Sequence, residues 1–263
     1  MFIFVLNLYF ICCRDMMNSV IYSALMLGGA SILGSAVGFV VKKIPHRLND
    51  IFLGYCAGMM LAAAIVCLAI PAIESAGDGR LWEVALGIAA GAALISLLDK
   101  VTPHLHNLTG LDAEEHRGNA SLNKVLLFVI AIAIHKLPEG MATGVAFDGS
   151  SLSNAETLSI SIALQNVPEG MVVITPLLVA GIKQWRAMIV AVIVAGLEMA
   201  GVFLGYWIGA VAGVILPSLM GMAAGAMLYV ISDEMIPETH AHGYQKAATF
   251  ALIAGFITLL FIE

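Results

Sequence analysis

Long apolar runs separated by short polar stretches make up most of the chain. At about 1.5 Å per residue, a helix needs roughly 17–25 residues to cross the hydrocarbon core of a bilayer. Runs of about this length predict eight spanning helices, of which the last is the shortest: 18–41, 51–74, 81–99, 124–147, 157–181, 186–211, 214–236 and 247–262. The pattern predicts an all-α polytopic membrane protein with one transmembrane domain at 18–263 and a cytoplasmic loop at 102–123.

The first residues are predicted to lie outside these spans. The stretch MFIFVLNLYFICC is too short to cross a bilayer, and it lacks the basic start and small-residue cleavage site of a signal peptide. Met16 and Met17 follow directly. We interpret 1–17 as an apolar N-terminal extension, either a mis-called start or an interfacial tail.

The composition excludes an ordinary soluble domain. Hydrophobic residues make up 60% of the chain and charged residues 11%, which is typical of a membrane protein. Nothing in the sequence suggests a nucleic-acid-binding surface. The four cysteines form no disulfide framework, because Cys56 and Cys67 lie about 16 Å apart along one helix. Cys12 and Cys13 are interpreted as small apolar fillers.

The basic residues are distributed unequally between the two sets of loops. Nine of them fall on one side if there are eight spans: Lys42, Lys43, Arg47, Lys100, Arg117, Lys124, Lys183, Arg186 and Lys246. Only Arg14 and Arg80 fall on the other side. Because cytoplasmic loops are enriched in Lys and Arg, we expect a multi-pass protein of the cell (plasma or inner) membrane with both termini extracytoplasmic.

One span carries ionisable residues at its centre. The run AIAIHKLPEGMATGVAF places His135, Lys136 and Glu139 in apolar sequence. Charged groups in hydrocarbon cost several kcal/mol, so they usually face a bundle interior and mark a transport pathway. His135 and Glu139 are four residues apart and share one helical face. Pro138 lacks a backbone N–H, which opens the helix about one turn earlier, around Ile134.

The next span repeats this arrangement. In LQNVPEGM, Gln165 precedes Glu169 by four residues, and Asn166 follows the glutamine. Pro168 again comes immediately before the glutamate. Two helices broken at mid-depth, each with nitrogen or oxygen donors, predict a site shared between them. The alternative is that proline and glycine only kink two packed helices whose polar groups bond to each other.

The donors indicate a class of ion. The two motifs offer imidazole nitrogen, amide oxygen and carboxylate oxygen: His135, Gln165, Glu139 and Glu169. Two carboxylates neutralise one divalent ion, as a low-dielectric site requires. Imidazole argues against Mg²⁺ and Ca²⁺, and the missing thiolates argue against Cu⁺. Zn²⁺ fits best, and Fe²⁺, Mn²⁺, Co²⁺ and Cd²⁺ remain candidates.

Two further residues at membrane depth are candidates. Glu198 is a lone carboxylate within IVAGLEMAGVFLG, where a site or proton-relay role is favoured over a protonated packing residue. Met60, in CAGMMLAAA, offers a thioether, although a methionine on an apolar helix is usually core filler.

Histidines and acidic residues cluster in the cytoplasmic loops, where such groups bind transition metals weakly. The candidates for a cytoplasmic exit are His104, His106, Glu234, Glu238, His240 and His242. The alternative is that these are solvated polar loops.

These residues resemble the ZIP (Zrt-/Irt-like) divalent metal-ion transporter family, in particular its prokaryotic GufA-type members. The resemblance covers residues 18–263 and is carried by HKLPEG at 135–140, QNVPEG at 165–170, Glu198 and DEMIPETH at 233–240. It implies a ZIP-like fold of eight transmembrane helices and inward movement of a divalent transition metal through a binuclear site at mid-membrane. It also implies an elevator-like motion of helices one, four, five and six against two, three, seven and eight.

The resemblance also implies the ligands of two metal positions. The first would use Met60, for which Met59 is a substitute, with His135, Gln165 and Glu169. The second would use the position of Lys136 with Glu139, Asn166 and Glu198.

This chain departs from the family at two of these positions. Related sequences commonly have Asn and Asp where this chain has Lys136 and Asn166. An ammonium group makes the second position unfavourable for a dication. Our hypothesis is that Lys136 pairs with Glu139 or Glu198 and replaces the second ion, leaving one transported metal. The rival explanation is a deprotonated lysine that acts as a ligand.

The sequence thus predicts zinc transport, with iron, manganese and cadmium as further substrates, and no resident cofactor. The expected partners are the metal ion and the lipid bilayer, with a homodimer left open. An intramembrane metal-dependent hydrolase is the enzymatic alternative, but the chain lacks H-E-x-x-H and a nucleophile with a paired base. We therefore expect no enzyme. A metal-selective channel is the other alternative.

Overall fold

The computed structural model describes the backbone of residues 2–41, 45–77, 79–101, 122–179 and 182–262. Side chains are described for most of these positions, the main exceptions being 2–15, 99–101 and 122–135. Every regular element in this part of the chain is a helix, which confirms the all-α prediction. Helices suit a lipid environment because each satisfies its own backbone hydrogen bonds.

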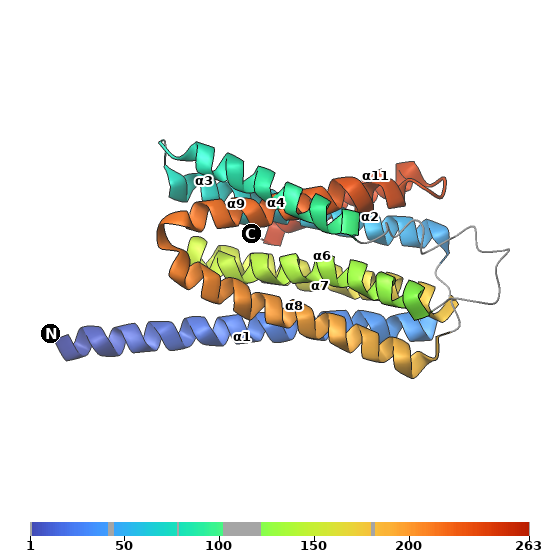
Figure 1. Ribbon diagram of the computed structural model, residues 1–263, viewed down its shortest axis with the longest axis horizontal. Helices are drawn as coiled ribbons and strands as arrows, with labels where there is room; N and C mark the ends of the chain where they lie inside the picture. Colours follow the sequence, from blue (N-terminus) through green and yellow to red (C-terminus); the bar gives the residue numbers. More distant parts are fainter. Residues whose placement is uncertain (1, 42–44, 78, 102–121, 180–181, 263) are drawn as a thin grey trace.

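Long helices run back and forth across the molecule (Figure 1). The elements up to residue 149 are α1 (Phe2–Val41), α2 (His46–Ala62), α3 (Ile70–Ala76), α4 (Leu81–Val101) and α6 (Leu122–Gly149). Those that follow are α7 (Leu152–Val179), α8 (Gln184–Ala212), α9 (Leu216–Val230), α10 (Ile236–Thr239) and α11 (Gln245–Ile262). The π-helical segments η1 (Ala63–Ala69) and η3 (Ile231–Met235) join α2 to α3 and α9 to α10, and a 3₁₀ turn, η2 (Gly213–Ile215), separates α8 from α9.

Five of the described helical segments are long and apolar enough to cross a membrane: Met16–Val40, His46–Ala76, Leu81–Leu98, Gln184–Thr239 and Gln245–Ile262. Gln184–Thr239 contains both α8 and α9, which meet at Gly213 with a φ of 45°. The expected spans at 124–147 and 157–181 coincide with α6 and α7, which are helical but are not among the five.

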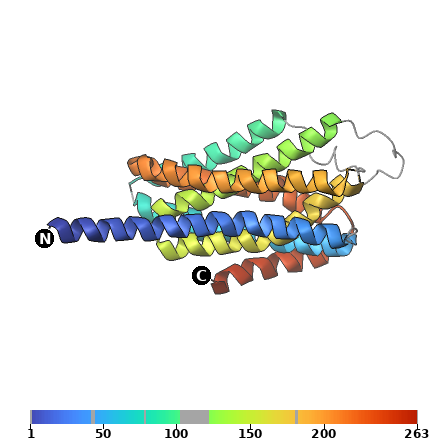
Figure 2. The same ribbon diagram turned by 90° about the horizontal axis from the view of Figure 1, so that it is seen from below.

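The apolar extension at the amino end is not separated from the first span. α1 begins at Phe2 and continues to Val41, and the part of it that is long and apolar enough to cross a membrane, Met16–Val40, is close to the expected first span. The early turns of α1 project beyond the other helices (Figure 2). The absence of proline and glycine before Gly28 accounts for this continuity.

The expectation that Pro138 and Pro168 break their helices is wrong. α6 and α7 continue through both prolines. The π-helical segments lie instead just before Pro71 and Pro237, where a wider turn accommodates the missing backbone donor. In α6 and α7, the glycine two residues after each proline packs directly on a neighbouring helix, and this contact holds the backbone in helical geometry.

The connections between helices gather at two ends of the bundle. Those between α1 and α2, α7 and α8, and α10 and α11 lie at one end (Figure 1). Those between α3 and α4, α6 and α7, and α8 and α9 lie at the other, and both chain termini lie toward this second end.

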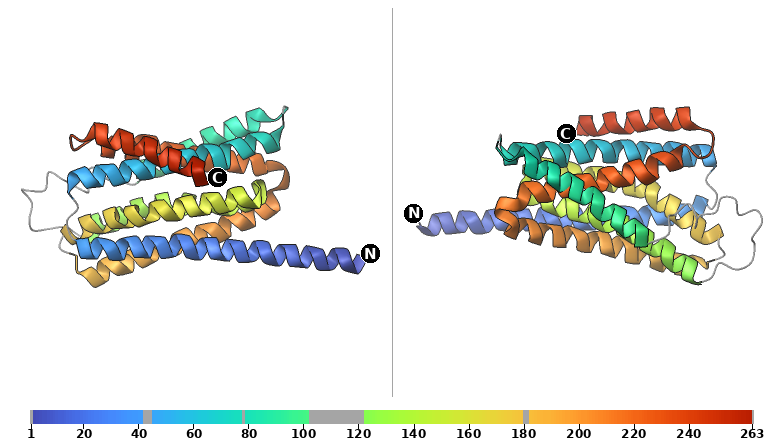
Figure 3. Two further views of the ribbon diagram at one scale, coloured as in Figure 1. Left: turned by 180° about the vertical axis from the view of Figure 1, so that it is seen from behind. Right: turned by 45° about the horizontal axis from the view of Figure 1, so that its top comes forward.

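The helices form two groups, which are the lower and upper layers of Figure 1 and are seen from behind in Figure 3. The α6 group consists of α1, α6, α7 and α8. The α9 group consists of α2, α3, α4, α9, α10 and α11. The most extensive contacts join α6 to α8, α1 to α7, α4 to α9 and α2 to α11, all of them within one group.

Glycines bring helix backbones together inside each group. A Cβ atom on Gly144 of α6 would collide with the backbone of α8, and one on Gly34 of α1 with that of α7. In the α9 group, Gly58 of α2 and Gly91 of α4 meet the backbones of α11 and α9 in the same way. Such small-residue contacts allow close packing of membrane helices.

Contact between the groups is of a different kind. Among the described glycines, Gly149 of α6 is the one that meets the other group, and it faces the flexible side chain of Met220 in α9. Each group is therefore joined internally through its backbones, whereas the boundary between them is filled by side chains.

Candidate metal centre

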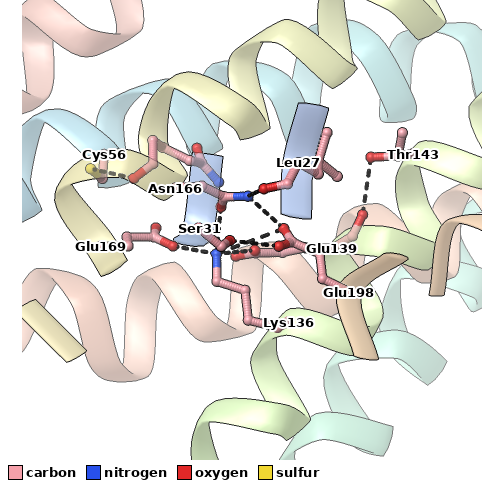
Figure 4. Close-up of polar contacts among 10 residues, drawn as sticks. Leu27, Ser31, Cys56, Lys136, Glu139, Thr143, Asn166, Glu169 and Glu198 are labelled. Atoms are coloured by element: carbon pink, nitrogen blue, oxygen red, sulfur yellow. Dashed lines mark hydrogen bonds and ion pairs between the residues drawn. The ribbon is translucent and has the colours of Figure 1, made fainter. Parts of the chain in front are cut away.

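Lys136 is the centre of a buried polar cluster. It lies near the middle of α6, and its side chain is 8% exposed. Its Nζ donates to Glu139 Oε2 at 2.7 Å, to Asn166 Oδ1 at 2.6 Å and to Glu169 Oε2 at 2.5 Å (Figure 4). Glu198 Oε1 lies 3.9 Å away. The structure thus pairs Lys136 with Glu139, as expected, and also with Glu169 of the second motif.

Glu198 is completely buried in α8 and has hydrogen bonds to both carboxylate oxygens. Asn166 Nδ2 donates to Oε1 at 2.7 Å, and Ser31 Oγ of α1 donates to Oε2 at 2.8 Å. Asn166 Nδ2 also contacts the carbonyl of Leu27 at 3.2 Å. The four helices of the α6 group therefore meet at one network, and Ser31 is a member of it that the sequence analysis did not identify.

The cluster contains more negative than positive groups. Three carboxylates approach one ammonium, so two negative charges are left in excess if all four groups are ionised. A low-dielectric interior opposes such an excess strongly. One divalent cation would neutralise it.

The side-chain amide of Gln165 has no partner among the described residues. Gln165 is 0% exposed, and neither Oε1 nor Nε2 makes a hydrogen bond. An unsatisfied buried amide costs about 1–3 kcal/mol, so such a group needs an explanation such as a missing ion or water. Its Oε1 is the kind of neutral donor that a metal site uses.

One sulfur atom of α2 contacts the second motif. Cys56 Sγ donates to the backbone oxygen of Gln165 at 3.6 Å. Met60 is four residues later, on the same face of α2, and is 1% exposed. Met59 is buried as well, but its backbone lies against Gly255 of α11. Met60 therefore stays the expected ligand, whereas the backbone of Met59 faces α11.

The chain is similar to proteins named zinc transporters. The sequence model of the family described as ZIP Zinc transporter matches residues 99–263. The chain is 39% identical to the zinc transporter ZIPB of Bordetella bronchiseptica, over 90% of this chain and 80% of that protein. It is 32% identical to the zinc transporter GufA of Myxococcus xanthus, over 94% and 98% of the two chains. It is 30% identical to the zinc transporter ZupT of Clostridium perfringens, over 93% and 96%.

The chain belongs to the ZIP family. The resemblance to its prokaryotic members is confirmed, and the polar cluster of this ZIP protein lies on the residues that carry the resemblance.

His135 is the main expected ligand whose side-chain contacts the structure does not describe. It lies in α6, one residue before Lys136, but its side chain is outside the described residues. Where side chains are described, no three His, Cys, Asp or Glu residues are arranged to hold a metal ion. Lys136 occupies the space between the carboxylates, which explains why these do not form such a group by themselves.

The expected exit residues are only partly described. His104 and His106 lie outside the described residues. His240 Nδ1 is bonded locally, 2.8 Å from the carbonyl of Ile236. His242 Nδ1 lies 2.9 Å from Asp50 Oδ1, and its ring stacks on His46 at 4.7 Å.

The two acidic residues of this expected exit, Glu234 and Glu238, both take part in interactions. The described contacts of His240 and His242 are with Ile236 and Asp50, and an exit role for this region stays a prediction.

Replacing Lys136 by methionine tests the ion-pair network. We expect the metal-free protein to lose about 3–5 kcal/mol of stability, because removing one partner leaves buried charges without compensation. Thermal unfolding in detergent with a chelator measures the loss. Lys183→Met is the matched control, since Lys183 is exposed and should leave Tm unchanged. Equal Tm values for wild type and Lys136→Met would contradict the network.

Proposed function

We propose that this ZIP protein moves divalent transition-metal ions, mainly Zn²⁺, across the cell membrane into the cytoplasm. The observation that carries the proposal is the buried cluster of three carboxylates and one ammonium beside the unpartnered amide of Gln165. One dication would neutralise the excess negative charge of this cluster. The relatives named zinc transporters support Zn²⁺ as the main ion.

The transported ion is proposed to bind Met60, His135, Gln165 and Glu169. Glu169 contacts Lys136 through Oε2, and a carboxylate with two oxygens can serve an ammonium and a metal ion together. Imidazole, amide, carboxylate and thioether donors suit Zn²⁺ and leave Fe²⁺, Mn²⁺ and Cd²⁺ as further substrates.

Removing the imidazole ligand or the carboxylate ligand tests the transported-ion site. His135→Ala and Glu169→Ala are expected to lower Zn²⁺ uptake into proteoliposomes at least about tenfold, because each removes a donor from a site with few donors. The control is Glu156→Gln, an exposed glutamate on the same helix α7 that accepts from Ser19 at 3.3 Å. Wild-type uptake by both alanine variants would refute the site.

The second metal position is proposed to hold Lys136 in place of an ion. Its Nζ is bonded to Glu139, Asn166 and Glu169 and lies 3.9 Å from Glu198. These are the residues that a second dication would need. An ammonium with three such acceptors is a satisfied tethered cation, which argues against its acting as a neutral ligand.

Metal counting distinguishes one ion from two. We expect the wild-type protein to bind one tight Zn²⁺ per chain, measured by elemental analysis after desalting. The double variant Lys136→Asn, Asn166→Asp removes the tethered cation and adds a carboxylate, so it is expected to bind two. Two tight ions in the wild type would refute the substitution of an ion by Lys136.

We propose the eight-span topology with both termini extracytoplasmic. In support, the connections at the end of the bundle opposite the termini include or adjoin Arg47, Lys183, Arg186 and Lys246. This is the end that the positive-inside rule assigns to the cytoplasm. His240 and His242 lie in the connection between α10 and α11 at this end, so an ion leaving toward the cytoplasm would pass this region.

Alternating access is proposed to occur by movement of the α6 group against the α9 group. Backbone-to-backbone glycine contacts are described within each group, while Gly149 meets only a side chain across the boundary. A boundary of side chains can repack when one group slides on the other, whereas interlocked backbones cannot. The proposed ligands on α6 and α7 would then move together.

A disulfide across the boundary tests this motion. Gly149→Cys with Met220→Cys joins the two groups, and Gly28→Cys with Met199→Cys joins α1 to α8 within one group. With the other cysteines replaced, oxidation is expected to stop Zn²⁺ uptake in the first pair and spare it in the second. Reduction should restore uptake. Unchanged flux through the oxidised first pair would favour a metal-selective channel instead.

A further inference from the structure

Cys56 occupies a position that the ligand set carried over from the family does not use. It is 0% exposed on α2, and its Sγ lies 3.6 Å from the backbone oxygen of Gln165 on α7. α2 belongs to the α9 group and α7 to the α6 group. The thiol therefore makes a direct contact across the boundary at the level of the candidate metal centre (Figure 4).

The residue that this thiol contacts carries an amide side chain without a hydrogen-bond partner among the described residues. Gln165, whose backbone accepts from Cys56, carries the buried side chain with neither Oε1 nor Nε2 bonded among the described residues. Glu169 lies one helical turn after Gln165 on α7. A donor-rich, buried location with unsatisfied groups indicates a missing ligand.

A second sulfur lies one helical turn away. Met60 follows Cys56 by four residues and is also buried in the main core cluster, so both sulfurs lie on one face of α2. A site that combines two sulfur atoms with carboxylate and amide oxygens is softer than one with a thioether alone. Soft donors favour thiophilic ions such as Cd²⁺, and Zn²⁺ accepts them readily.

We propose that Cys56 is an additional metal ligand that increases the preference of the site for Cd²⁺ over harder dications. The proposal rests on the function proposed above. On ligation the S–H bond breaks, a metal–sulfur bond forms, and the released proton passes to a site carboxylate or to water. The competing explanation is that Cys56 fills the core and donates to Gln165 without touching the ion.

Spectroscopy of Cd²⁺ binding tests the ligand directly. The full-length protein is purified with Cys12, Cys13 and Cys67 replaced by serine and is titrated with Cd²⁺. We expect an ultraviolet thiolate-to-cadmium charge-transfer band that saturates with the bound ion and is reversed by excess Zn²⁺. The matched control retains Cys67 instead of Cys56. Cys67 is equally buried and lies on the same continuous helical segment, and it should give no band.

Affinity provides the second measurement. Cys56→Ser is expected to lower the affinity for Cd²⁺ at least about tenfold and to lower that for Mn²⁺ much less, because Mn²⁺ gains little from sulfur. Cys56→Ala, which keeps the packing volume small and apolar, should show the same loss if serine disturbs folding. The proposal would be overturned if the ratio of the Cd²⁺ affinity to the Mn²⁺ affinity were the same in the wild type and in both variants.

The outcomes separate this proposal from the transport function. Tight Cd²⁺ binding without a charge-transfer band in the Cys56-only protein would refute Cys56 as a ligand and leave the transport site intact. Absence of binding together with absence of Zn²⁺ uptake by wild type would refute both.

Discussion

The ion-pair network between one lysine and three buried carboxylates is the interaction on which the interior of this protein depends. Glu139, Glu169 and Glu198 come from three helices and converge on Lys136. In hydrocarbon, three carboxylates without a counter-charge would repel one another and would each lose the solvation of water. Their approach therefore needs the ammonium and the hydrogen bonds from Asn166 and Ser31. These contacts hold α1, α6, α7 and α8 together as one unit. The glycine contacts between the same helices also hold them together.

A tethered cation differs from a bound ion in one respect, because it cannot leave. Lys136 keeps a tethered positive charge between Glu139 and Glu169. The charge lowers the attraction of the second position for any dication by direct repulsion. The bonds of Lys136 to Asn166 and Glu169 also join α6 to α7 without an ion.

The sequence allowed prediction of the elements and of the polar residues at membrane depth, because charges within apolar runs are few and each one must be accounted for. This reasoning identified His135, Lys136, Glu139, Gln165, Glu169 and Glu198.

The relative rotation and depth of the helices could not be predicted from the sequence. The sequence offered Glu139 or Glu198 as partners of Lys136, whereas the structure adds Glu169, whose approach depends on how α6 and α7 align. Continuity through Pro138 and Pro168 also depended on tertiary contacts, since the isolated sequence favours a break there. Cys56 gained its significance only when α2 was placed against α7, although its spacing of four residues from Met60 was a signal available beforehand.

The location of the sulfur donors has a consequence for release of the ion. Met60 and Cys56 belong to α2 in the α9 group, whereas Gln165 and Glu169 belong to α7 in the α6 group. If an ion is held by both groups, it stabilises the state in which they are aligned. Movement of the α6 group would then carry the oxygen donors away from the sulfurs, and the ion would keep fewer ligands. Binding strength would fall along the same motion that opens the site to the other side. Two groups that share one site can thus convert a displacement of helices into a loss of affinity, provided that the donors are divided between them.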